Sequence, residues 1–197
     1  MPRVVDHRAR RAEIVSAVID LIAAEGAEAV TVRKAAAAAG VSAGALAHYF
    51  ADKEALLTAA FAEVVARSGV RMRTLPTDGD VADLLYQALL APLPLTDARR
   101  TEARVWLAFL DRALIREDAT ALLREVYEAW RRSVADIIGK GQRDGRLRAD
   151  LDPDATAHAL VALVDGLTLQ AAVDPAALDA DALRRLVDAQ VRSLLAE

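Results

Sequence analysis

Apolar residues recur at every third or fourth position through most of the chain, which is the spacing of one face of an α-helix. This pattern predicts about nine helices, over residues 8–25, 31–39, 42–49, 53–73, 80–90, 97–115, 118–143, 153–171 and 179–195. No segment alternates apolar and polar residues as a half-buried strand does. We therefore predict an all-α fold.

Proline and glycine interrupt this pattern after the fourth helix, in the sequence Leu-Pro-Thr-Asp-Gly at 75–79. Such clusters favour turns between helices. We predict an N-terminal domain over 1–54 and a C-terminal domain over 55–197, with the helix at about 53–73 connecting them.

Residues 31–53 predict two short helices joined by a sharp bend. Thr31 and Ser42 can each cap a helix through the side-chain hydroxyl, and Gly40 can adopt the positive φ that the bend requires. The second of these helices carries mainly small side chains, so its backbone can approach a DNA groove closely. This arrangement is typical of a helix-turn-helix motif.

The same residues resemble a known family. Thr-Val-Arg at 31–33, Ala-Gly-Val-Ser at 39–42, Gly-Ala-Leu at 44–46, His-Tyr-Phe at 48–50 and Asp-Lys-Glu-Ala-Leu-Leu at 52–57 resemble the TetR family of transcriptional regulators. The rest of the chain resembles the C-terminal domain of the BetI-type branch. The resemblance implies a three-helix DNA-binding domain followed by a helical domain for effector binding and dimerisation.

The chain departs from the family pattern at three alanines. The family usually has isoleucine at Ala35, a longer polar or basic residue at Ala43 and an aromatic residue at Ala47. Fewer side chains should therefore contact bases. The predicted DNA-binding residues are Thr31, Arg33, Lys34, Ser42, Ala43, Gly44, Ala45, His48, Tyr49 and Lys53. Tyr49 could equally be a core residue, and Lys53 a solvated residue of a first helical turn.

The net charge of −4 is unevenly distributed along the chain. Residues 1–11 carry four arginines and one aspartate, whereas residues 150–197 carry nine acidic residues and three arginines. Such a distribution would orient the protein on DNA. The absence of cysteine fits a reducing compartment, and we expect neither a signal peptide nor a membrane span, so we predict a cytoplasmic protein.

Nothing in the sequence indicates catalysis, a cofactor or a metal site. His7, His48 and His158 lie far apart, without the spacing that gathers metal ligands on one helical face. Gly139-Lys140-Gly141 lacks the earlier glycine of a phosphate-binding loop. We predict that the protein is not an enzyme.

The C-terminal domain contains candidates for an effector pocket. Five of the aromatic residues fall between positions 86 and 130, and large aromatic side chains often line sites for apolar or cationic ligands, although they more often fill cores. Glu102 and Asp111 could supply polar groups. The predicted pocket residues are Tyr86, Trp106, Phe109, Tyr127, Trp130 and Asp165.

The last two helices each carry an apolar stripe that a partner subunit could cover. The predicted dimer-interface residues are Leu160, Val164, Leu167, Leu183, Leu186, Val187, Val191 and Leu194. The pattern is equally consistent with packing inside the chain's own core. A two-fold dimer would suit a palindromic DNA site, because symmetry repeats the recognition helix on each half-site.

The function predicted from these observations is a homodimeric transcriptional repressor that binds double-stranded operator DNA and is released by a small-molecule effector. Two alternatives belong to other classes: a helical small-molecule-binding protein that never contacts DNA, and a helical enzyme with an unrecognised site. DNA binding that strengthens at low salt would distinguish the repressor from both.

Overall fold

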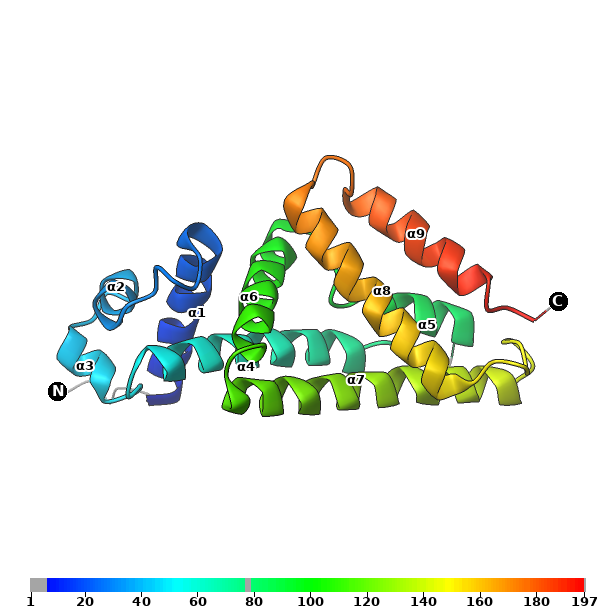
Figure 1. Ribbon diagram of the computed structural model, residues 1–197, viewed down its shortest axis with the longest axis horizontal. Helices are drawn as coiled ribbons and strands as arrows, with labels where there is room; N and C mark the ends of the chain where they lie inside the picture. Colours follow the sequence, from blue (N-terminus) through cyan, green and yellow to red (C-terminus); the bar gives the residue numbers. More distant parts are fainter. Residues whose placement is uncertain (1–6, 77–78, 197) are drawn as a thin grey trace.

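The computed structural model describes residues 7–76 and 79–196, so Arg3 of the basic N-terminal cluster and residues 77–78 of the expected boundary lie outside it. Within these ranges the chain forms helices without a β-strand, as expected (Figure 1). The helices are α1 (His7–Glu25), α2 (Val32–Ala38), α3 (Ala43–Ala47), α4 (Lys53–Arg73), α5 (Val81–Leu90), α6 (Asp97–Ala113), α7 (Glu117–Arg143), α8 (Pro153–Val173) and α9 (Ala180–Arg192).

Helices α1–α3 form an N-terminal unit at one end of the elongated molecule (Figure 1). Thr31 Oγ1 accepts a hydrogen bond from the Lys34 amide, and Ser42 Oγ accepts one from the Ala45 amide, both at 3.1 Å. Gly40 between the two helices has φ +64°, which costs a residue without a Cβ little strain. The expected helix-turn-helix geometry is therefore present.

Helix α4 leaves the N-terminal unit and runs into the rest of the molecule. Asp52 Oδ1 caps it by accepting a hydrogen bond from the Ala55 amide at 2.8 Å. The first half of α4 packs with α1–α3 in one cluster, whose buried members include Ile14, Val18, Ala35, Leu46, Phe50, Leu57 and Val64. The N-terminal unit thus shares its core with the helix that connects it to the C-terminal half.

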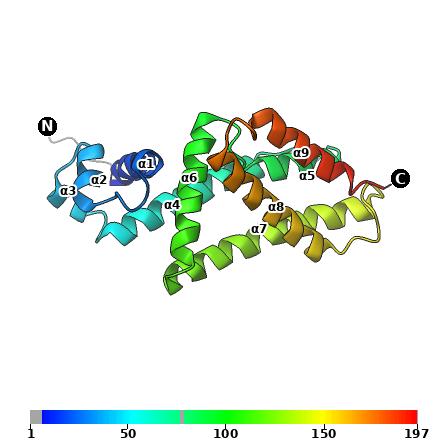
Figure 2. The same cartoon turned by 45° about the horizontal axis from the view of Figure 1, so that its top comes forward.

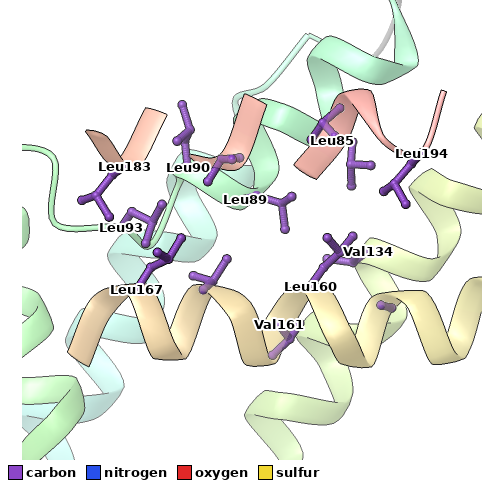
Figure 3. Close-up of a cluster of buried hydrophobic side chains, with 14 of the residues drawn as sticks. Leu85, Leu89, Leu90, Leu93, Val134, Leu160, Val161, Leu167, Leu183 and Leu194 are labelled. Carbon is purple, nitrogen blue, oxygen red and sulfur yellow. The ribbon is translucent and has the colours of Figure 1, made fainter. Parts of the chain in front are cut away.

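Helices α5–α9 form a C-terminal unit, in which α5, α7, α8 and α9 enclose a second core that is rich in leucine and valine (Figure 3). Leu85, Leu89, Leu93, Leu160 and Leu183 are each at most 1% exposed. Helix α6 also packs against the N-terminal unit, since Val105 belongs to that unit's core. Figure 2 shows α6 between the N-terminal unit and the other helices of the C-terminal unit.

The last helix is shorter than expected. It ends at Arg192 rather than near residue 195. Leu195 instead pairs with Leu147 in an isolated antiparallel bridge, where the Arg148 amide donates to Leu194 O and the Ala196 amide donates to Arg146 O, both at 3.0 Å. Backbone pairing with the α7–α8 connection therefore replaces the last helical turn.

Helix α8 is long and apolar enough, by length and composition, to cross a membrane. Its buried residues pack inside the C-terminal core, and Leu160, Val161 and Val164 are 1–3% exposed. We therefore interpret its composition as that of a core helix.

We predict that Gly141→Ala destabilises the fold. A Cβ at this position would lie 2.6 Å from Leu147 Cγ and 3.2 Å from Val81 Cγ1, and both residues are buried. Overpacking of this kind typically costs about 1–3 kcal/mol. Chemical denaturation should show a lower free energy of unfolding for Gly141→Ala than for the wild type.

Gly139→Ala is the matched control on the same helix. Its Cβ would meet only the flexible Arg143 Nη1, at 3.4 Å, so the higher helix propensity of alanine should leave stability unchanged or slightly raised. Equal free energies of unfolding for the two variants would show that the close contact with Leu147 does not destabilise Gly141→Ala.

Candidate DNA-binding surface and effector cavity

Helix α3 presents small residues to solvent. Ser42, Ala43 and Gly44 are exposed and Ala45 is half-buried, whereas Leu46 is fully buried and anchors the helix to the N-terminal core. A Cβ at Gly44 would meet no atom closer than Ser42 Oγ at 4.0 Å. The surface of α3 can therefore approach another molecule closely.

Both predicted DNA-binding lysines are already paired with carboxylates. Lys34 Nζ lies 2.6 Å from Glu25 Oε2, and Lys53 Nζ lies 3.6 Å from Glu28 Oε2 and donates to Glu28 O at 3.2 Å. Arg33 is exposed on the first turn of α2. The structure thus favours Arg33 over Lys53 as an available cation for a phosphate.

The other predicted DNA-binding residues also lie in this unit. Thr31 and His48 are exposed. Tyr49 is half-buried, and its ring lies 5.6 Å from that of His7, centroid to centroid. Arg11 stacks over Phe50, with Cζ 4.8 Å from the ring centroid. The basic first turns of α1 therefore adjoin the turn after the recognition helix, and the sequence reasoning did not include them in the surface.

A cavity of about 450 Å³ lies in the C-terminal half, bounded by α4, α6, α7 and α8. Its walls are mostly apolar, and they include Val64, Val65, Met72, Ala103, Trp106, Leu122, Val126, Ala129, Trp130 and Val164. The charged residues along it are Arg71, Arg73, Glu102, Glu125 and Asp165. An apolar cavity of this size with a few charged groups is typical of a small-molecule site.

Three predicted pocket residues, Trp106, Trp130 and Asp165, do line this cavity. The Trp106 indole nitrogen donates a hydrogen bond to Asp165 Oδ1 at 3.1 Å. The rings of Trp106 and Trp130 are nearly perpendicular, at 86°, with centroids 6.4 Å apart. One carboxylate and two aromatic rings are therefore held together in the wall.

Burial has the largest effect on the pKa of the Asp165 carboxyl group. It raises the pKa of Asp165 above the usual value of an aspartate, while the hydrogen bonds that Tyr127 and Trp106 donate to the carboxylate oppose the shift. Burial, with the hydrogen bond to Asp165, also raises the pKa of Tyr127. Tyr127 therefore stays a neutral donor to Asp165 Oδ2.

An ion pair joins α4 and α6 at the same cavity. Arg71 Nη2 lies 2.7 Å from Glu102 Oε2, and Arg71 Nε donates to Ala91 O at 2.8 Å. Glu102 is only 6% exposed, so its charge is compensated by this partner. Arg71 and Glu102 thus offer the cavity little net charge.

Three predicted pocket residues need correction. Tyr86 packs against the C-terminal core, and Phe109 is buried against Phe61, with centroids 3.7 Å apart. Tyr127 does not line the cavity; it packs against Trp106 and Trp130 and donates a hydrogen bond to Asp165. Asp111 is exposed and does not line the cavity. The α4 wall, including Ser68, Gly69 and Met72, was missed.

The predicted dimer-interface residues also need correction. Seven of the eight lie inside the chain's own core, at 0–6% exposed: Leu160, Val164, Leu167, Leu183, Val187, Val191 and Leu194. Leu186 is 44% exposed. The apolar side chains that α8 leaves exposed to solvent are instead Ala155, Ala159, Ala162, Leu169, Ala172 and Val173.

Comparison with known sequences matches both halves of the chain. Residues 14–60 match the profile of bacterial regulatory proteins of the tetR family, and residues 81–196 match that of the BetI-type transcriptional repressor, C-terminal. The HTH-type transcriptional regulator PksA of Bacillus subtilis is 33% identical, covering 100% of this chain and 95% of the relative. The regulator BetI 2 of Chromohalobacter salexigens is 30% identical, covering 99% and 93%.

Solved structures of transcriptional regulators share the fold. One from Rhodococcus sp. Rha1 superimposes with a TM-score of 0.84 and 29% identity, over 93% of this chain and 95% of that one. Another, from Saccharomonospora viridis in complex with choline, has a TM-score of 0.89 and 26% identity, over 96% and 99%. With both halves matched and the helix-turn-helix in place, the chain belongs to the TetR family of transcriptional regulators and carries a BetI-type C-terminal domain.

Proposed function

We propose that the protein is a cytoplasmic, homodimeric repressor that binds a palindromic operator and is released by a small organic cation, and that it is not an enzyme. The observation that supports the effector class is Asp165, a half-buried carboxylate that accepts a hydrogen bond from Trp106 and lines the cavity together with Trp106 and Trp130. Family membership supports DNA binding through α3.

The aromatic and acidic wall suits a cation with an apolar surface. A quaternary ammonium gains from the faces of tryptophan rings and from a nearby carboxylate, and it makes few demands for hydrogen bonds. The structural relative from Saccharomonospora viridis was solved with choline, which has this chemistry. Phe61 stacks on Trp106 with ring centroids 5.5 Å apart, so core packing supports the Trp106 side of the proposed cation site.

The outward face of α8 is our proposed dimer surface. Leu169 and Val173 are 52% and 79% exposed, and a Cβ at Gly166 would meet no atom within 4 Å. Alanine and glycine allow close approach of a second helix, and the leucine and valine supply apolar area. A two-fold axis at this face would give two recognition helices for the two half-sites of an operator.

We predict that Leu169→Glu converts the dimer to a monomer, because the substitution places a charge on the apolar face of α8. Sedimentation equilibrium measures the change. Wild-type protein should also enrich an inverted repeat from a random pool of duplexes, and Leu169→Glu should not. Leu114→Glu is the control, since Leu114 is 86% exposed at the α6–α7 corner and should leave the dimer intact. A monomeric wild type would contradict the proposal.

We predict that Arg33→Gln weakens binding to all duplex sequences and lowers the magnitude of the salt slope by about one, as loss of one phosphate contact does. Lys53→Gln should change the slope less, because Lys53 is already paired with Glu28. Affinity measured against salt concentration, with Arg132→Gln on α7 as control, tests both. A larger change for Lys53 than for Arg33 would mean that the pair with Glu28 opens on DNA.

We predict that choline binds the wild type and releases it from the selected duplex, and that Asp165→Asn lowers choline affinity at least about tenfold, or about 1.4 kcal/mol. Calorimetry measures the affinity. The pKa of Asp165 is raised, so binding should weaken as pH falls and should do so at a higher pH than an ordinary aspartate would cause.

The pH dependence should disappear in Asp165→Asn, because the titrating group is gone. Asp111→Asn removes a carboxylate from the same half of the protein without touching the cavity and should bind choline like the wild type. Choline affinity that is unchanged in Asp165→Asn would refute the cation site.

A further inference from the structure

The cavity has a second charged end that the cation site does not use. Arg73, on the last turn of α4, lines it and is exposed at its mouth. No carboxylate lies within ion-pair distance of its guanidinium in the described part of the chain, unlike Arg71, which is paired with Glu102. Among residues 7–76 and 79–196, Arg73 is therefore a cation at the cavity without a carboxylate partner.

Gly69 gives this guanidinium its position. A Cβ at residue 69 would lie 3.0 Å from Arg73 Nη1, which is closer than such contacts normally are. The side chain of Arg73 thus folds back by one turn along α4, against the wall that Gly69 itself contributes. Glycine in a helix interior costs about 1 kcal/mol relative to alanine, and here it makes room for the guanidinium.

The two charged ends are separated along α4. The Asp165 end lies beside Phe61, because Trp106 both stacks on Phe61 and donates to Asp165. Gly69, where the guanidinium of Arg73 rests, follows Phe61 by eight residues, or about 12 Å of helix at 1.5 Å per residue. Val65 and Met72 of α4, and Val126 and Ala129 of α7, line the cavity with apolar surface.

We propose that the effector is a zwitterion, with an ammonium group at the Asp165 end, an apolar chain of about 10 Å along α4, and a carboxylate at Arg73. This proposal rests on the cation site proposed above and extends it. A cavity of about 450 Å³ accommodates such a molecule, and a bare choline would leave the arginine end unused. The guanidinium can donate two parallel hydrogen bonds to a carboxylate.

Calorimetry with two probes of equal chain length tests the proposal: octyltrimethylammonium and 8-(trimethylammonio)octanoate, which carries the same cation and a carboxylate in place of the terminal methyl group. The wild type should bind the zwitterion at least about tenfold more tightly than octyltrimethylammonium. In Arg73→Gln this ratio should fall to about one. Asp165→Asn should weaken both probes, because the ammonium end is common to them.

The chain contains a matched control for Arg73. Arg143 lies in the last turn of α7, and its Nη1 would be 3.4 Å from a Cβ at Gly139, but it does not line the cavity. Arg143→Gln should therefore keep the wild-type ratio, since it removes the same charge from the same helical position.

The possible failures are distinguishable. A ratio near one in the wild type, or an unchanged ratio in Arg73→Gln, would overturn the zwitterion while leaving the cation site in place. Absence of choline binding, together with zwitterion binding that Asp165→Asn does not weaken, would overturn both proposals. Thermal unfolding of each variant separates a loss of the fold from a loss of the arginine contact.

Discussion

The packing of α6 on two sides is the constraint on which the rest of the structure depends. On one side, Val105 is buried in the core of the N-terminal unit, and Arg104 Nη1 donates to Ala23 O at the end of α1 at 2.6 Å. On the other side, Glu102 and Trp106 line the cavity. A ligand that displaces Trp106 therefore acts on a helix that also holds α1.

A second contact joins α6 to the beginning of α4. Arg112 forms an ion pair with Glu54, which lies two residues after the Asp52 cap and therefore close to the recognition helix. Arg112 Nη1 donates a hydrogen bond to Glu54 Oε1 at 3.3 Å, and Arg116 Nε lies 3.4 Å from Glu54 Oε2, so two arginines at the end of α6 and just after it hold this carboxylate. Coupling of about 1–3 kcal/mol between effector and DNA is typical of such regulators, and small movements of a packed helix can supply it.

The helices could be predicted closely from the sequence because their ends carry local signals. Thr31, Ser42 and Asp52 each cap a helix through a side-chain oxygen, and Gly40 fixes the turn. The cavity could be predicted only in part, because an apolar stripe looks the same whether it faces a core, a cavity or a partner. Phe109 was therefore assigned to the pocket, whereas Met72 was not recognised as part of it.

Helix α8 shows most directly why the stripe was ambiguous. Leu160 packs in the core, Asp165 faces the cavity and Leu169 faces solvent, all within three turns of one helix. Hydrophobic spacing correctly predicts that Leu160 is buried, but it does not show whether the chain's own core or a partner subunit buries it. Small residues such as alanine contribute little to a hydrophobic stripe, so the outward face of α8 is not recognised from the spacing. Because the proposed effector site and the proposed dimer face share α8, an effector bound at Asp165 would alter how two subunits are set relative to each other. An effector would then change the spacing of two recognition helices without altering either one.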